Sequence, residues 1–156
     1  MAAPSPFTDK EIAFLRALLD EGVEFLVVGL ADAALQGAPA VTQDVDLWFA
    51  DLNDPRLKKA LARTRAAYVP PTDSTPPLLA GGGTDLFDIV MHMHGLETFE
   101  DEVRRAAIVK IGGIAVPVLP LERIIASKRA TGRPKDLSIL PALEDALRVR
   151  AAEKRD

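Results

Sequence analysis

The chain has 156 residues, 48% of them hydrophobic and 27% charged, which is ordinary composition for a globular protein. It contains no cysteine, which excludes a disulfide framework, a thiolate metal site and a cysteine nucleophile. The net charge of −4 argues against a broad DNA-binding surface. With no apolar run near the roughly 20 residues of a membrane span, and no signal peptide pattern, we expect a cytoplasmic protein without a membrane partner.

The first elements predict a helix, a strand and a second helix. Thr8 and Glu11 have the spacing of a capping box, and apolar residues then repeat at helical spacing over residues 9–20. The run 23–28 is typical of a buried strand, and a small-residue helix over 31–36 follows Gly29. A strand, a glycine and a helix start in succession form a plausible phosphate cradle. The alternative is a tight turn that needs no ligand, which is the more common reason for a lone glycine.

Residues 42–49 form the most informative stretch, because two carboxylates sit inside a run of strand formers. On a strand, Asp44 and Asp46 would share one face while Val45 and Leu47 face the core. Like charges side by side are unfavourable unless a cation joins them. Hard oxygen ligands at this spacing suit Mg²⁺, or Mn²⁺ in its place. The alternative is two solvated aspartates on an edge strand.

The middle of the chain adds a third strand carboxylate. Asp54 before Pro55 predicts a helix start, with a basic outer face that is either solvated or a contact surface for phosphate or RNA. Residues 69–84, rich in proline and glycine, predict a loop that is either a lid or an ordinary connection. The strand pattern over 84–91 carries Asp88 on the face opposite its apolar residues. His92 and His94 continue that face, as substrate-orienting groups, a base or plain surface residues.

The last third predicts a hairpin followed by two helices. Two glycines separate the apolar runs 107–111 and 114–118, and a helix then runs from Pro120 to Gly132. The final helix begins at residue 134 with a kink at Pro141, or begins near Ser138. The fold class is therefore α/β (α+β), with a small mixed β-sheet, helices on one face and a C-terminal helical pair.

These motifs together resemble the DNA polymerase beta-type nucleotidyltransferase superfamily. The likeness rests on Val28-Gly29-Leu30, the spaced pair Asp44-Val45-Asp46, and the later Phe87-Asp88-Ile89. It is closer to small bacterial nucleotidyltransferase-like proteins, including those related to AbiEii-type toxins. The segment 127–137 looks like the C-terminal lysine–glycine–arginine–lysine–aspartate signature of those proteins, so the resemblance covers residues 23–145.

The resemblance implies one nucleotidyltransferase-like domain over residues 1–156, with a core over 9–118 and C-terminal helices over 120–152. It also implies roles for particular residues. Asp44, Asp46 and Asp88 would be the catalytic residues and bind the metal ion. The nucleotide would be contacted by Gly29, Leu30, Thr42, Lys128, Arg133 and Lys135. The alternative for the basic segment is a helix–helix corner whose charges pair with Asp136 and Glu144.

Two positions depart from the pattern of the superfamily. Leu30 occupies the position after the glycine, where relatives usually have serine or a second glycine against the phosphates. Ala40 stands where relatives often have arginine. The carboxylate side of the site therefore matches the pattern better than the nucleotide side does.

Two functions follow as hypotheses. The first is an Mg²⁺-dependent enzyme that moves a nucleoside monophosphate from a nucleoside triphosphate (NTP) to a hydroxyl group of a protein, an RNA or a small molecule. The second is a catalytically degenerate relative that acts by binding, as one member of a toxin–antitoxin type of pair. An unrelated α/β fold with solvated carboxylates is a third interpretation. The sequence leaves the acceptor and the oligomeric state open.

Overall fold

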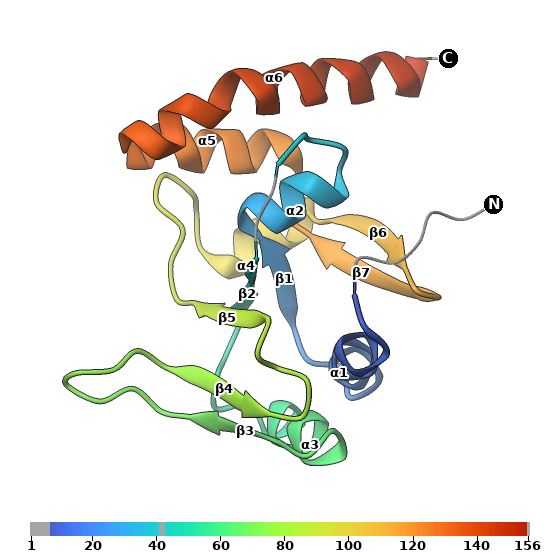
Figure 1. Cartoon of the computed structure of the whole chain (residues 1–156), viewed down its shortest axis with the longest axis vertical. Coiled ribbons are helices and arrows are strands. Elements are labelled where there is room, and N and C mark those ends of the chain that lie inside the picture. The colour runs from blue at the N-terminus through green and yellow to red at the C-terminus, as the bar shows by residue number, and fades with distance from the viewer. Residues whose placement is uncertain (1–6, 41–42, 156) are drawn as a thin grey trace.

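The computed structural model describes residues 7–40 and 43–155 and is organised around a five-stranded mixed sheet in the order β5-β2-β1-β7-β6 (Figure 1). Strand β1 pairs antiparallel with β2 and parallel with β7, while β2 pairs parallel with β5 and β6 pairs antiparallel with β7. The strands are β1 (Phe25–Val28), β2 (Val45–Phe49), β5 (Phe87–Val90), β6 (Ala107–Ile111) and β7 (Ile114–Val118). The predicted mixed sheet and the hairpin at its end are confirmed.

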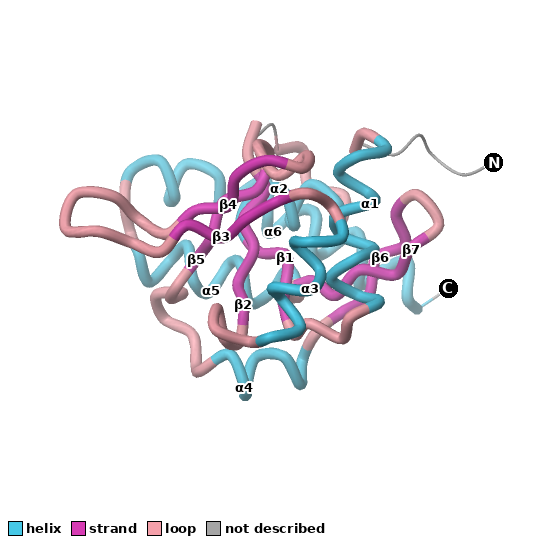
Figure 2. Tube along the Cα trace, turned by 90° about the horizontal axis from the view of Figure 1, so that it is seen from below, coloured by secondary structure: helices cyan, strands magenta, loops and turns pink. Residues whose placement is uncertain are grey.

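Helices cover the sheet as the predicted fold class requires. Helices α1 (Asp9–Asp20) and α3 (Pro55–Arg63) pack on one face, and the C-terminal pair α5 (Leu121–Thr131) and α6 (Pro134–Arg155) packs on the other (Figure 2). The remaining helical elements are α2 (Gly29–Leu35), α4 (Phe99–Glu102) and the 3₁₀ turn η1 (Val103–Arg105). In the described part of the chain, no helix is both long and apolar enough to cross a membrane.

The alternation of side chains along the strands divides the core into two clusters. In β1, Phe25 and Val27 face α1 and α3, whereas Leu26 and Val28 face the C-terminal pair. All four side chains are buried, which explains why this strand has a continuous apolar run rather than an alternating one. The central strand that leads to Gly29 is thus fixed on both faces.

Local sequence signals set two of the helix starts. The Thr8 hydroxyl accepts a hydrogen bond from the Glu11 amide (3.2 Å), and the Glu11 carboxylate accepts one from the Thr8 amide (2.8 Å). The Asp54 carboxylate caps α3 by accepting from the Arg56 amide (2.9 Å). Both caps satisfy amides that a helix leaves without partners. The predicted bounds 9–20 are confirmed.

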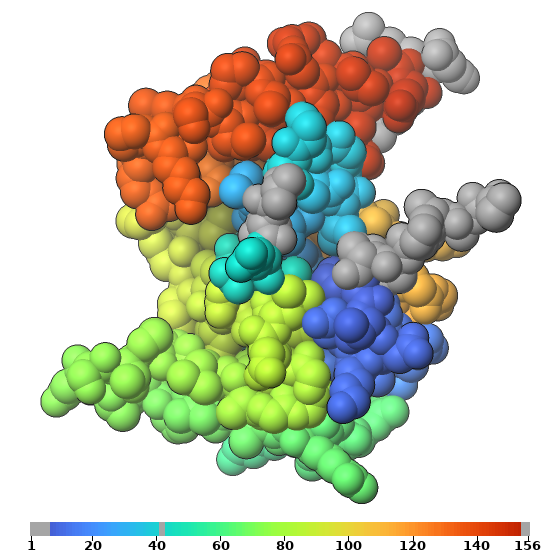
Figure 3. All heavy atoms as spheres, in the orientation of Figure 1, coloured from blue at the N-terminus to red at the C-terminus, as the bar shows by residue number. Residues whose placement is uncertain are grey.

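The interpretation of residues 69–84 as one loop is wrong. The chain forms β3 (Ala66–Val69) and β4 (Leu78–Gly81), an antiparallel pair that projects from the body on the side away from α5 and α6 (green in Figure 3). The two strands bury one side chain between them, that of Leu79, so they lack the continuous apolar run that marks β1. The four prolines lie between the two strands, where they disturb no ladder hydrogen bond.

The structure also decides between the two alternatives for the last helix. Helix α6 begins at Pro134 and continues past Pro141. A proline in the first position needs no amide partner, and Pro141 removes one intrahelical bond that the packing of α6 against α5 outweighs. Leu140 and Leu143, on either side of Pro141 in α6, are buried in the core cluster between the sheet and the C-terminal helices.

Candidate functional site

Strand pairing brings predicted site residues together at one end of the sheet. Asp46 of β2 is the cross-strand neighbour of Val28 on β1 and of Asp88 on β5. Because cross-strand neighbours project to the same face, Asp46 and Asp88 lie side by side on the face that also carries Trp48 and the C-terminal helices. Asp46 is half-buried and Asp88 is exposed.

Asp44 lies just before β2 rather than within it. The strand begins at Val45, and Asp44 is exposed. The predicted alternation still holds for the core side, since Val45 and Leu47 are buried. Asp44 remains close enough for its charge to act on both Asp46 and Asp88.

Gly29 is held against Asp46 by a backbone that a larger residue cannot adopt easily. It has φ +76°, in the left-handed region, and a Cβ atom at this position would lie 2.6 Å from the Asp46 Oδ2 atom. Helix α2 begins at Gly29, directly after β1, so the expected strand, glycine and helix start are all present. Both the conformation and the space require glycine here.

Burial and neighbouring negative charges raise the pKa of Asp46 and of Asp88. Burial is the largest cause for Asp46, followed by the negative charge of Asp88, while the Lys128 ammonium acts in the opposite direction. Burial also raises the pKa of Asp88, with a further contribution from Asp44. A cation between these groups would reverse the repulsion, so the donors have the chemistry of a site for a hard divalent ion.

The arrangement of these oxygens fits Mg²⁺ held jointly with a ligand rather than by the protein alone. Among residues 7–40 and 43–155, no three acidic or histidine side chains are gathered closely enough to form a ready-made metal site. Mg²⁺ usually takes one or two carboxylates and completes its shell with water and substrate phosphates. Asp46 and Asp88 supply such a pair.

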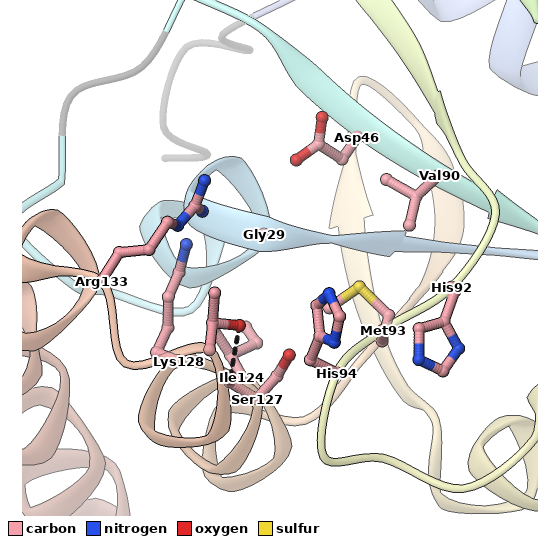
Figure 4. A pocket seen from close by; sticks show the side chains of 11 residues that line it. Gly29, Asp46, Val90, His92, Met93, His94, Ile124, Ser127, Lys128 and Arg133 are labelled. Carbon is pink, nitrogen blue, oxygen red and sulfur yellow. Dashed lines mark hydrogen bonds between the residues drawn. The ribbon is translucent and has the colours of Figure 1, made fainter. Parts of the chain in front are cut away.

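A cavity of about 370 Å³ opens between this end of the sheet and α5 (Figure 4). Gly29 and Asp46 line it from the sheet, and Lys128 and Arg133 line it from the other side. In Figure 4 both cationic side chains point toward the strand ends that carry Gly29 and Asp46. One wall of the cavity therefore carries a carboxylate, and the opposite wall carries two cations.

Both cations are ion-paired to one buried carboxylate. The Lys128 Nζ atom lies 3.1 Å from Asp136 Oδ1, and the Arg133 Nε atom lies 2.7 Å from Asp136 Oδ2. Arg129 pairs with Glu144 nearby. The predicted alternative of a charge-paired corner is thus present, and the same corner lines the cavity.

Histidines line the cavity where β5 ends. His92 and His94 are exposed, and their rings meet edge to face with centroids 5.2 Å apart. Figure 4 shows His94 between Asp46 and α5, with His92 farther out. Both histidines follow β5, and their place in the cavity lining leaves each of them available to orient a substrate or to act as a base.

Two other predicted nucleotide contacts, Leu30 and Lys135, do not line the cavity. Leu30 is half-buried in α2, and Lys135 is exposed in the first turn of α6 and does not line the cavity. Ala40 is half-buried in the segment before β2. Thr42 falls outside the described residues.

One buried acid of this region was expected from the sequence as a possible ion-pair partner, and another was missed. Asp136, the partner given in the alternative of a charge-paired corner, anchors both cavity cations, because α5 and α6 fold back on each other there. Asp32 of α2 is fully buried, and its Oδ1 atom accepts a hydrogen bond from Gln36 (2.6 Å). Burial raises the pKa of Asp32 well above the ordinary range. The small-residue pattern of 31–36 gave no sign that this acid faces inward.

Solved structures with the same fold are nucleotidyltransferases. ANT(2″)-Ia in complex with adenylyl-2″-tobramycin matches with a TM-score of 0.56 and 16% identity over 92% of this chain and 94% of that one. A proposed nucleotidyltransferase from Thermotoga maritima matches with a TM-score of 0.55 and 20% identity, over 92% and 89%. A nucleotidyltransferase-like protein from Paracoccidioides brasiliensis matches with a TM-score of 0.51 and 18% identity, over 91% and 78%. The chain therefore has the nucleotidyltransferase fold.

No protein-family model matches the sequence, and no curated protein is similar to it.

Proposed function

We propose that the protein transfers a nucleoside monophosphate from an NTP to a hydroxyl group. The observation that carries this proposal is the pairing of Asp46 with Asp88 beside Gly29, across a cavity from Lys128. The structural likeness to ANT(2″)-Ia, which was solved with an adenylylated product, supports the same reaction class. The acceptor stays a prediction, and so does the role in a toxin–antitoxin type of pair that the sequence resemblance to AbiEii-type toxins implies.

In this reaction the oxygen of the acceptor hydroxyl forms a bond to the α-phosphorus, and the bond from that phosphorus to the bridging oxygen breaks, so that pyrophosphate leaves. A bound Mg²⁺ would be held by Asp46 and Asp88 together with the phosphates of the nucleotide, with Asp44 as the predicted third carboxylate beside them, and would neutralise charge on the phosphates. Asp88 is the exposed member of the pair, on the side from which an acceptor can enter. Its exposed carboxylate is therefore the member of the pair that can accept the proton of the hydroxyl.

The two cavity cations would bind the pyrophosphate that leaves in this reaction. Lys128 and Arg133 face Asp46 across the cavity, where the β- and γ-phosphates of a bound nucleotide would lie. Gly29 leaves room for close approach at the sheet end, because it has no side chain to fill the space beside Asp46. These residues do not define the acceptor or the preferred base of the nucleotide.

Labelling with α-³²P NTPs tests the proposal. The parent protein is incubated with Mg²⁺, each NTP and three acceptor pools: the protein itself, cellular RNA, and hydroxyl-rich small molecules including an aminoglycoside. We expect label on one pool, and its loss in the Asp44→Asn and Asp46→Asn variants. Equal labelling by the parent and both variants would contradict the proposal, as would the absence of label from all pools.

A second function is favoured by Leu30 and by the ion pairs of the corner. Leu30 supplies no hydroxyl at the position after Gly29, and Lys128 and Arg133 already have a carboxylate partner. Both features suit a protein that binds a nucleotide or a partner protein without turnover, as in a toxin–antitoxin type of pair. A thermal-shift titration separates the cases: a shift with Mg²⁺ and NTP but no label on any acceptor favours binding alone.

A further inference from the structure

The corner between α5 and α6 is built around one buried carboxylate. Lys128 is in the last turn of α5, Gly132 turns the chain with φ +67°, and α6 begins at Pro134. Asp136 therefore lies in the first turn of α6, where a negative charge is favoured by the helix dipole. Its side chain is 1% exposed and does not line the cavity.

Asp136 contacts the two cations that do line the cavity. Its Oδ1 accepts a hydrogen bond from Lys128 (3.1 Å), and its Oδ2 accepts one from Arg133 (2.7 Å). The Lys128 side chain is 20% exposed and that of Arg133 is 67% exposed, so each reaches from a buried anchor toward open space. These bonds hold the pKa of the Asp136 carboxyl below its ordinary value, with Arg133 as the largest cause.

We propose that Asp136 is a positioning residue, which holds Lys128 and Arg133 side by side so that they bind the polyphosphate tail of the nucleotide. This role rests on the proposed function for its substrate, because an NTP is the polyphosphate expected in this cavity. Long cationic side chains have many rotamers, and ordering them on binding costs affinity. A buried carboxylate that fixes both removes that cost before the ligand arrives.

A second buried pair in the same region provides a comparison. Glu102 of α4 is fully buried and accepts hydrogen bonds from Arg123 of α5 at 2.9 and 2.6 Å. Neither residue lines the cavity. This pair joins two helices, as Asp136 does, but the two residues that donate to Glu102, Arg123 and Glu97, do not line the cavity. Breaking either pair destabilises the fold, whereas only the loss of Asp136 should change polyphosphate binding.

The test measures binding of inorganic tripolyphosphate by calorimetry in metal-free buffer, with the parent protein and the variants Asp136→Asn, Asp136→Glu and Glu102→Gln. We expect Asp136→Asn to raise the Kd about tenfold, the loss typical of one misplaced charge-assisted contact. Asp136→Glu should recover part of that loss because it keeps the charge. Glu102→Gln should lower the melting temperature and leave the Kd unchanged.

Three results would overturn the inference. They are a parent protein that does not bind tripolyphosphate, an Asp136→Asn variant that binds as tightly or more tightly, and a Glu102→Gln variant that loses binding to the same extent as Asp136→Asn. Tighter binding would mean that Asp136 competes with the ligand instead of positioning its partners. Because the assay involves no transfer, binding that depends on Asp136 in a protein without transferase activity would contradict the proposed function alone.

Discussion

Replacing Asp88 by asparagine should stabilise the metal-free protein while removing its proposed activity. Asp46 and Asp88 are neighbours on parallel strands, and each has a raised pKa that reflects burial and the negative charges nearby. Asparagine has nearly the same shape and no charge. The variant therefore relieves repulsion around Asp46 without leaving a hole.

The size of the effect follows from the strand spacing. Parallel strands lie about 4.8 Å apart, and two unit charges at that distance repel by about 1 kcal/mol when one of them is exposed and screened by water. In a domain of this length, about 1 kcal/mol raises the melting temperature by about 2–4 °C. The gain should be seen at pH 7.5 in buffer with a chelator.

The sign of the pH dependence is also defined. A carboxyl whose pKa is raised by folding makes the folded state lose stability as pH rises from the ordinary value of about 3.9 to the raised one. The advantage of Asp88→Asn should therefore disappear near pH 4 and be complete at neutral pH. The fluorescence of the single tryptophan, Trp48, reports unfolding because its ring is buried against Phe99.

Asp85→Asn is the matched control, since Asp85 is an exposed aspartate that precedes the same strand. It should change the melting temperature by less than the Asp88 variant does. Added Mg²⁺ and NTP should stabilise the parent protein more than Asp88→Asn. If Asp88→Asn melts at or below the temperature of the parent in metal-free buffer, the two carboxylates do not repel as argued.

Three other substitutions test separate parts of the structure. Asp32→Asn should flatten the loss of stability between pH 4 and 8 in denaturant melts, because the raised pKa of this buried acid makes it unfavourable at high pH; an unchanged slope would contradict this. Gly29→Ala should lose about 1–3 kcal/mol more than Gly37→Ala, which also has positive φ but open space around it; equal urea midpoints would contradict the close approach to Asp46. Leu143→Ala should cost about 2–5 kcal/mol in the same assay, and a loss below 1 kcal/mol would contradict its full burial.

Signals confined to a few neighbouring residues predicted their elements well. The capping box of Thr8 and Glu11 marked the start of α1, and the two glycines between apolar runs marked the β6–β7 hairpin. The β3–β4 pair was missed because its strands bury one side chain between them, that of Leu79, and prolines and glycines flank them. Hydrophobic patterns lose their force in strands that bury so little.

The site was predicted only in part, because contacts between residues far apart in the sequence leave no local pattern. Alternation placed Asp46 and Asp88 on strands, but their pairing depends on a parallel register between β2 and β5 that no local pattern encodes. Likewise, the sequence offered Asp136 as an alternative partner for the basic segment, whereas the meeting of Lys128 and Arg133 at that one carboxylate required the fold-back of α6 on α5. Asp32 was missed for another reason. Its small neighbours allow the acid to be buried, but they give no pattern of large apolar residues that would mark this face of α2 as buried.

The most direct test of the account is the fate of the phosphates during turnover. ATP, Mg²⁺ and the acceptor identified by labelling are followed by ³¹P nuclear magnetic resonance with the parent protein and with Asp46→Asn. The account predicts that pyrophosphate and a monophosphate-linked acceptor appear together in equal amounts with the parent protein, and that neither appears with the variant. Release of orthophosphate, or consumption of ATP that does not depend on Asp46, would contradict nucleotidyl transfer at this site.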